Sequence, residues 1–379
     1  MKNMFKLGAW MLTLALSGFA CTGRTAHEAS EKGETQRLRY AENLTIMDYP
    51  AYTVVTLRNP WDTLKTLHTY VLVPDSGALP TQLPEGTLIR TPLRHAVVYS
   101  SVHCGLLREL GAENAIGGVC DVKYIKLPEL RKAVQQGRVA DCGDGMNPDV
   151  ERIINLHPDA VLLSPFENSG GYGRVEKLGV PLIECADYME TSARGRAEWM
   201  KFYGRLFGAE AKADSLFARV DSIYQSLKDS AEASAVRMSV FCELKNGAAW
   251  YVPGGHSTTG RILHDAGSNY AFADDAHSGS VPLAFETVFQ RAGEADIWLI
   301  KYHRPKDMTY SDLQADYVAY AGFKAFRERR VYGCNTAKAA FYEETPFHPE
   351  WLLEDLMQIL HPEMQKGGAR RYFHELKEE

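Results

Sequence analysis

Short apolar segments alternate with longer amphipathic ones through the middle of the chain. Residues 96–99 (AVVY), 160–163 (AVLL) and 181–184 (PLIE) read as strands, and 106–110 and 148–156 carry the spacing of helices. Apolar strands that alternate with helices predict a parallel sheet covered on both faces. Ligands of such sheets bind at the carboxyl ends of the strands.

A long helical segment separates this series from a second one. Between Trp199 and Leu227, apolar residues recur at steps of three, four or seven, which marks one face of a helix. Gly208 is expected to end a first helix, and 209–227 then forms a helix about 28 Å long, enough to join two lobes. The second series has strands at 238–241, 295–300 and 330–332 and helices at 260–265, 285–290 and 351–360.

The pattern therefore predicts an α/β protein: two Rossmann-like lobes with parallel-rich sheets, joined by a long bridging helix. We expect the lobes to move little, because one helix is stiffer than a pair of extended crossovers. Residues 44–95 contain alternating segments such as 53–57 and 70–74, which predict an added β layer. The expected boundaries are a signal peptide at 1–20, a tether at 21–43, the N-terminal lobe at 44–192, a helical linker at 193–229 and the C-terminal lobe at 230–379.

The N-terminus has the features of an export signal. Lys2 and Lys6 precede an apolar run at 8–20, which is too short to span a bilayer. Small residues stand beside Cys21, as at a lipoprotein processing site, and an ordinary signal peptide cleaved near Ala20 is the alternative. We expect an exported protein of the periplasm or cell envelope, held at a membrane by a lipid on Cys21.

Composition and cysteine spacing narrow the function classes. A length of 379 residues suggests two domains, and a net charge of −6 argues against nucleic acid as a partner. No closely spaced cysteine pair of the kind that holds zinc occurs, and we expect no cofactor. The remaining six cysteines can form one disulfide or stay as free thiols, and free thiols are favoured. They are Cys104, Cys120, Cys142, Cys185, Cys242 and Cys334.

Several short motifs follow one another at characteristic spacing. In the first lobe they are 107–119 (LRELGAENAIGGV), 147–153 (NPDVERI), 157–161 (HPDAV) and 178–183 (LGVPLI). Related segments of the second lobe lie at 253–257, 263–267, 283–288 and 295–298. Over residues 92–362 the chain resembles the substrate-binding proteins of ABC importers for ferric siderophores, haem and cobalamin.

The resemblance implies two partners, a small-molecule ligand and the ABC-transporter permease, for a monomeric protein. Glu151 and Glu286 match the glutamates that dock onto permease arginines in that family, one on each lobe. The alternative is purely local, because an acidic residue in a first helical turn gains about 0.3–1 kcal/mol from the helix dipole.

Loops that follow the strands supply the expected ligand contacts. Arg304, Lys301 and the neighbouring tyrosines suit an anionic complex, so the expected ligand is a ferric siderophore, then cobalamin or another corrinoid, then haem. Each aromatic or basic side chain has the alternative of a purely structural role. The candidates are Ser101, His103, Asp144, Met146, Tyr172, Trp250, Tyr251, His256, Arg304 and Tyr342.

The sequence offers limited features for two other functions. His103 and His256 suggest bare-metal capture, but no His-rich loop accompanies them. A hydrolase with a triad of Ser100, His103 and Asp144 lacks any GxSxG, HExxH or phosphate-loop motif, so we expect no enzymatic activity.

Overall fold

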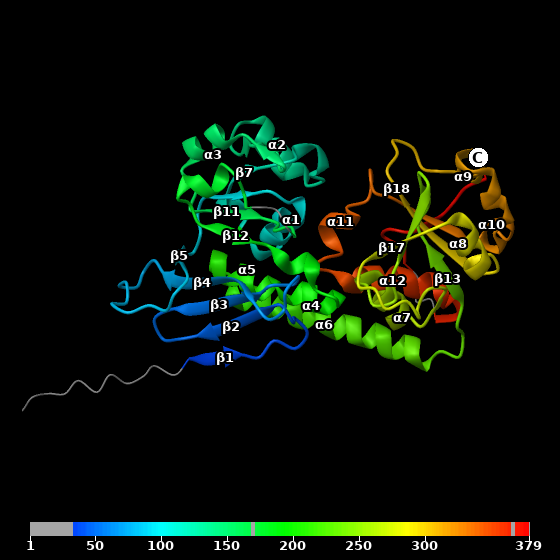
Figure 1. Ribbon diagram of the computed structural model, residues 1–379, viewed down its shortest axis with the longest axis horizontal. Coiled ribbons are helices and arrows are strands. Elements are labelled where there is room, and N and C mark those ends of the chain that lie inside the picture. The colour runs from blue at the N-terminus through cyan, green and yellow to red at the C-terminus, as the bar shows by residue number, and fades with distance from the viewer. Residues whose placement is uncertain (1–32, 168–170, 365–367, 379) are drawn as a thin grey trace, which may run out of the picture. The chain divides into compact units, whose positions relative to one another are not determined.

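The computed structural model describes residues 33–167, 171–364 and 368–378 (Figure 1). The predicted signal peptide and the lipidation site at Cys21 lie outside these residues. No helix in the described part combines the length and apolar composition that crossing a bilayer requires.

The described chain begins with a five-stranded sheet, in the spatial order β1-β2-β3-β4-β5. Alternate side chains of its strands, such as Ile46 and Val55, are fully buried and share a core with Trp199 and Phe202. This confirms the added β layer. The strands are β1 (Glu34–Gln36), β2 (Leu44–Asp48), β3 (Thr53–Arg58), β4 (Thr66–Pro74) and β5 (Thr87–Thr91).

The fold starts inside the predicted tether. Besides β1, the backbone N–H groups of Arg39, Tyr40 and Ala41 donate to the carboxylate of Glu198, which is completely buried. A buried carboxylate that accepts several N–H bonds fixes the segment in place. The predicted tether of 21–43 therefore extended too far toward the C-terminus.

The first α/β lobe follows, with a parallel sheet in the order β12-β11-β6-β7-β8. The chain enters at β6, and β7 and β11 then pair on its two opposite sides. The order of strands thus reverses at β6. The strands are β6 (Ala96–Val98), β7 (Ile116–Val119), β8 (Ala140–Asp141), β11 (Ala160–Leu163) and β12 (Leu182–Glu184), with a hairpin of β9 (Gly143–Asp144) and β10 (Asn147–Pro148) and helices α1 (Ser101–Leu110), α2 (Pro128–Gln135) and α3 (Val150–Leu156).

Helices α4 (Ala193–Glu198), α5 (Met200–Phe207) and α6 (Glu210–Ala233) connect the lobes. Gly208 ends α5 with a φ of 66°, as expected of a C-terminal glycine cap. Phe217 and Val220 of α6 belong to the core of the first lobe, whereas Tyr224 belongs to the core of the second. The bridging helix is confirmed and continues past the predicted 209–227, to 24 residues.

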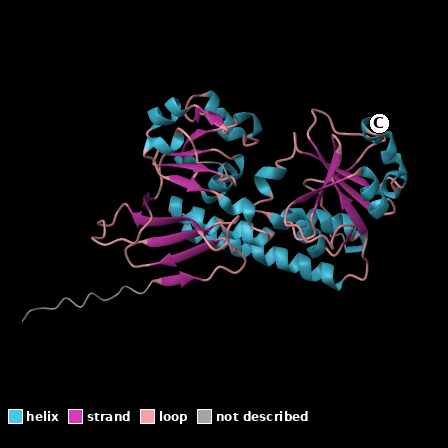
Figure 2. Cartoon of the chain, in the orientation of Figure 1, coloured by secondary structure: helices cyan, strands magenta, loops and turns pink. Residues whose placement is uncertain are grey.

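The second α/β lobe repeats the arrangement, and Figure 2 shows strands flanked by helices in both lobes. Its main sheet has the order β16-β13-β18-β19-β20 and is parallel except for β20. The strands are β13 (Ser239–Cys242), β16 (Asn269–Tyr270), β18 (Ile297–Tyr302), β19 (Val331–Asn335) and β20 (His374–Glu375), beside a small sheet of β14 (Lys245–Asn246), β15 (Ala249–Pro253) and β17 (Ser280–Leu283). The helices are α7 (Thr258–Asp265), α8 (Phe285–Ala292), α9 (Tyr310–Asp316), α10 (Lys324–Arg327), α11 (Phe341–Glu344) and α12 (Pro349–Leu360).

The α/β class, the parallel-rich sheets and the two lobes are thus as predicted. The six cysteines in the described part of the chain are buried and free, which confirms the preference for thiols over a disulfide.

Candidate functional site

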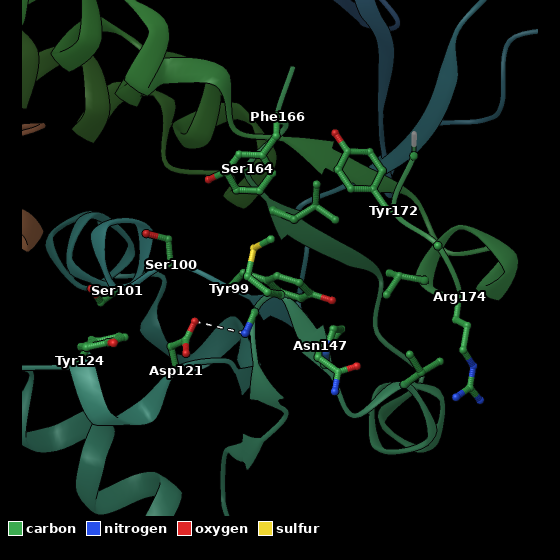
Figure 3. Close-up of a pocket in the computed structure, with 18 residues that line it drawn as sticks. Tyr99, Ser100, Ser101, Asp121, Tyr124, Asn147, Ser164, Phe166, Tyr172 and Arg174 are labelled. Atoms are coloured by element: carbon green, nitrogen blue, oxygen red, sulfur yellow. Dashed lines mark hydrogen bonds between the residues drawn. The ribbon is translucent and has the colours of Figure 1, made fainter. Parts of the chain in front are cut away.

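A cavity of about 710 Å³ lies at the carboxyl edge of the first-lobe sheet (Figure 3). Three strands deliver its lining: Tyr99 and Ser100 follow β6, Asp121 follows β7, and Ser164 follows β11. This is the point where strand order reverses, which is where open α/β sheets bind their ligands. The volume is in the range of small-molecule sites.

Aromatic rings from separate segments surround this cavity. They belong to Tyr99, Tyr124, Phe166 and Tyr172, and Met146 adds a side chain that is 78% exposed. Figure 3 shows the rings of Tyr99, Phe166 and Tyr172 around one space. Flat, polarizable walls of this kind suit an aromatic or macrocyclic ligand.

The hydroxyl of Tyr99 is an unsatisfied polar group at the cavity. Its oxygen is buried and has no hydrogen-bond partner among the described residues. Burial also raises the pKa of Tyr99, so the phenol stays protonated. Because buried polar atoms nearly always have partners, this hydroxyl is positioned to bond a ligand atom.

The charged groups of the cavity are unequally engaged. Oδ2 of Asp121 accepts the Gly145 N–H at 3.2 Å, and Oδ1 lies 3.8 Å from Nζ of Lys123. Arg174, in contrast, forms no ion pair with any residue in the described part of the chain. The N-terminus of α1, capped by Ser100, faces the same cavity. A free guanidinium and a helix N-terminus favour an anionic ligand group.

Three of the predicted ligand residues lie together here: Ser101, Met146 and Tyr172 line the cavity. Asp144 lies next to it without lining it. Its carboxylate accepts the Met146 N–H at 2.9 Å and lies 3.7 Å from Nζ of Lys123.

His103 does not face the cavity. It is buried on α1, and Nε2 lies 2.9 Å from Oδ1 of Asp187 and 3.1 Å from Oη of Tyr203. Burial would raise the pKa of Asp187, but His103 and Arg196 lower it to about 2. His103 thus belongs to a buried ion-pair network rather than to a ligand site. Within the described residues its ring forms no hydrogen bond to the side chain of Ser100 or Asp144, so a triad of these three side chains is not assembled.

Trp250 is likewise a core residue. It is fully buried on β15, its indole N–H donates to the carbonyl of Cys242 at 2.9 Å, and it packs among the rings of Phe241 and Trp298. Alternation along a strand places its neighbour Tyr251 on the other face, where 48% of that side chain is exposed. Trp250 is therefore removed from the candidate set.

The remaining second-lobe candidates are exposed or engaged in ion pairs. His256 and Tyr342 are exposed, whereas Arg304 binds both oxygens of Asp316 at 2.8 and 2.6 Å. Lys301 pairs with Glu243 where β13 and β18 end, beside a void of about 30 Å³. That void is far smaller than a small-molecule site. Lys301 and Arg304, the basic groups expected to meet an anionic ligand, are thus already neutralised.

The two docking candidates are free of such partners. Glu151 stands in the first turn of α3 and Glu286 in the first turn of α8, and both are exposed. Neither forms an ion pair or side-chain hydrogen bond within the described residues. They are available to a protein partner, and their docking role stays a prediction.

Sequence reasoning missed Tyr99, Asp121, Tyr124 and Arg174. Tyr99 was predicted as the last residue of the strand 96–99, but β6 ends at Val98, so Tyr99 stands at the carboxyl edge of the sheet where ligands bind. Asp121 follows β7. The sequence did not predict this strand because it contains Gly117 and Gly118, and glycine is depleted in strands. Both glycines are required: an added Cβ would lie 2.1 Å from the His95 ring and 2.8 Å from Sγ of Cys142.

Two α/β lobes joined by one helix, with a ligand-sized cavity where strand order reverses, define a two-lobed solute-binding protein. Residues 96–337 match the family model described as periplasmic binding protein. The chain belongs to this family, whose members capture solutes for ABC importers and are binding proteins rather than enzymes. The resemblance found in the sequence is confirmed.

Curated relatives agree with this assignment. An uncharacterised lipoprotein of Methanocaldococcus jannaschii is 24% identical over 91% of this chain and 86% of its own length. The petrobactin-binding protein of Bacillus subtilis is 26% identical over 39% of this chain and 45% of its own. A second uncharacterised lipoprotein of the same organism is 26% identical over the full length of both chains.

Solved structures share the fold. A periplasmic haem-binding protein from Pseudomonas aeruginosa has a TM-score of 0.59 at 15% identity and covers 75% of this chain and 98% of its own. At that identity the likeness establishes the fold alone.

Proposed function

We propose that the protein binds an iron chelate, a ferric siderophore, and delivers it to the permease of an ABC importer. The observation that carries the proposal is the buried hydroxyl of Tyr99 in an aromatic cavity lined also by Arg174, neither of which has a side-chain partner among the described residues. Ferric siderophore complexes are commonly anionic and carry aromatic or amide donors, which fit these groups.

The basis of the proposal differs from the one the sequence suggested. Lys301 and Arg304 are neutralised by Glu243 and Asp316, so the anionic ligand is assigned to Arg174 in the first lobe. The match to the petrobactin-binding protein of Bacillus subtilis supports a siderophore. A corrinoid and haem are the other ligands that the same aromatic walls suit.

Bare-metal capture has less support. Among the described residues, no group of three or more His, Cys, Asp or Glu is placed to hold a metal ion. His103 of the suggested pair is bonded to Asp187 in the core.

The test is calorimetric titration of the purified protein with ferric petrobactin, ferrioxamine B, cobalamin, haemin and zinc chloride. We expect a ferric chelate to bind with a Kd of about 1 µM or tighter, the others more weakly. Tyr99→Phe should weaken that binding, and Tyr332→Phe, on β19 of the second lobe and outside the cavity lining, is the matched control. Tight binding of cobalamin or haemin without any ferric chelate would reverse the ligand order, and binding of zinc alone would contradict the class.

A further inference from the structure

Tyr172 forms a wall between two depressions. One is the 710 Å³ cavity, and the other is a groove of about 540 Å³ between the added sheet and β12. The added sheet contributes His68, Thr87 and Leu88 to that groove, and the first lobe contributes Glu184. The added sheet lies outside the region 96–337 that the family model matches.

A chain of side-chain contacts leads from the cavity wall to the added sheet. The Tyr172 hydroxyl donates to Oε1 of Glu184 at 2.6 Å, and in Figure 3 this hydroxyl points away from Tyr99. Glu184 is the last residue of β12 and is only 8% exposed. Its other oxygen, Oε2, is buried, has no hydrogen bond from the part of the chain that the structure describes, and lies 3.2 Å from Nδ1 of His68. Burying a carboxylate costs free energy unless it has a partner, and His68 is the group that faces Oε2 of Glu184.

His68 is itself held in a fixed orientation. Its Nε2 lies 2.7 Å from Oγ1 of Thr87 on β5, and its ring stacks on Tyr70 with centroids 4.3 Å apart. Tyr70 accepts the Glu184 N–H at 2.8 Å and donates to the Leu182 carbonyl at 3.1 Å. The ring of His68 is therefore placed by its own sheet, independently of the cavity.

Attachment of the added sheet alone does not account for this arrangement. Tyr70 already bonds β4 to the backbone of β12 at two points. His68 and Glu184 form an additional connection from the added sheet to Tyr172, a side chain that lines the cavity. Attachment of the sheet to β12 does not require this connection.

We propose that the added sheet is part of the ligand site, with His68 as a positioning residue: through Glu184 it fixes the Tyr172 ring that forms one wall of the cavity. This rests on the proposed function in so far as the cavity takes a ligand. Specificity for the shape of that ligand then depends in part on residues that never touch it, because a rigid wall excludes chelates of the wrong outline.

The test labels the protein with fluorotyrosine and follows the Tyr172 ring by fluorine NMR, with Tyr172→Phe assigning its signal. His68→Gln removes the group that faces Glu184, and Thr87→Val is a milder change that frees only the ring of His68. The matched control is His264→Gln, at a side chain 79% exposed on α7. Each variant is also titrated with ferric petrobactin, and its melting temperature is measured.

We expect the Tyr172 signal to shift or broaden in His68→Gln and, less strongly, in Thr87→Val, with a rise in Kd of about fivefold for His68→Gln. The control should match the wild type. A lower melting temperature with an unchanged Tyr172 signal and Kd would overturn the proposal, since His68 would then only join the sheets. If the wild type binds no ferric chelate, the proposed ligand fails, and the NMR signal alone decides whether His68 orders Tyr172.

Discussion

Nε2 of His348, at the start of α12, lies 2.6 Å from Oε2 of Glu109, near the end of α1. Nδ1 of the same ring lies 2.7 Å from Oε1 of Glu350, and Trp351 stacks on it with centroids 3.7 Å apart. Since Glu109 belongs to the first lobe and His348 to the second, this is an ionic contact between the lobes. Burial lowers the pKa of His348, but the bonds to Glu109 and Glu350 outweigh it and raise the pKa to about 9.

This contact predicts a pH-dependent stability. The pKa of His348 in the folded protein exceeds its unfolded value of about 6.5. Its contribution to the free energy of unfolding is therefore complete below about pH 6.5 and is lost as the pH rises through about 9. His348→Gln should lower the free energy of unfolding by about 1–3 kcal/mol at pH near 6, and by less above the folded pKa. Urea unfolding at two pH values measures this, with the exposed His264→Gln as control. A difference that does not change with pH would contradict the assignment.

The unequal engagement of two arginines predicts unequal effects on binding. Arg174→Gln should weaken binding of ferric petrobactin about tenfold, because Arg174 is unpaired at the cavity. Arg304→Gln should leave the Kd unchanged, because Asp316 already neutralises that side chain. Calorimetric titration of both variants provides the measurement. Equal losses would show that the second lobe supplies charge as well.

We expect replacement of Trp250 to lower the stability of the protein and to leave its ligand affinity unchanged. Trp250→Leu removes a fully buried ring and its bond to the Cys242 carbonyl, which should cost about 3 kcal/mol of unfolding free energy. The folded fraction should still bind with the wild-type Kd. Weaker binding at unchanged stability would return Trp250 to the ligand site.

The docking role of Glu151 and Glu286 predicts a separation of uptake from binding. The double alanine variant should abolish uptake in cells and keep the wild-type ligand affinity, because both side chains are exposed and lie outside the cavity lining. A matched control replaces Glu113 and Glu210, which are also exposed and stand in the first turns of helices. Reduced affinity in the purified double variant would disprove the separation.

The bridging helix predicts limited motion between the lobes. Side chains of α6 are built into both cores, Phe217 in one and Tyr224 in the other, so bending α6 would disturb both. Small-angle scattering with and without ferric chelate should give the same radius of gyration within error. A clear contraction on binding would show a hinge that this helix does not prevent.

Periodicity predicted the elements that are long or apolar enough to leave a pattern. The strand at 160–163 has the predicted bounds, and the helix at 148–156 starts two residues later because Pro148 pairs in the hairpin β9–β10. β7 was not predicted because Gly117 and Gly118 weaken the strand pattern. Glycine is needed at both positions because His95 and Cys142, which are distant in sequence, leave no room for a Cβ.

The site was predicted as a set of loops but not as a set of side chains. The loops after β6 and β11 do line the cavity, as the edge of a parallel sheet requires. Successive side chains of a strand point to opposite faces, so only one of two neighbours can face the core. In β15 Trp250 is buried and Tyr251 is exposed. For Arg304 the deciding fact was its pairing with Asp316, twelve residues away, which no local pattern shows.

We expect a ferric chelate to bind in the cavity beside Tyr99. The direct measurement is anomalous X-ray scattering at the iron edge from crystals of the protein grown with ferric petrobactin. One iron peak is expected inside the cavity bounded by Tyr99, Tyr172 and Arg174. An iron peak among Lys301, Arg304 and Tyr342 of the second lobe alone, or no peak in crystals saturated with the chelate, would contradict it.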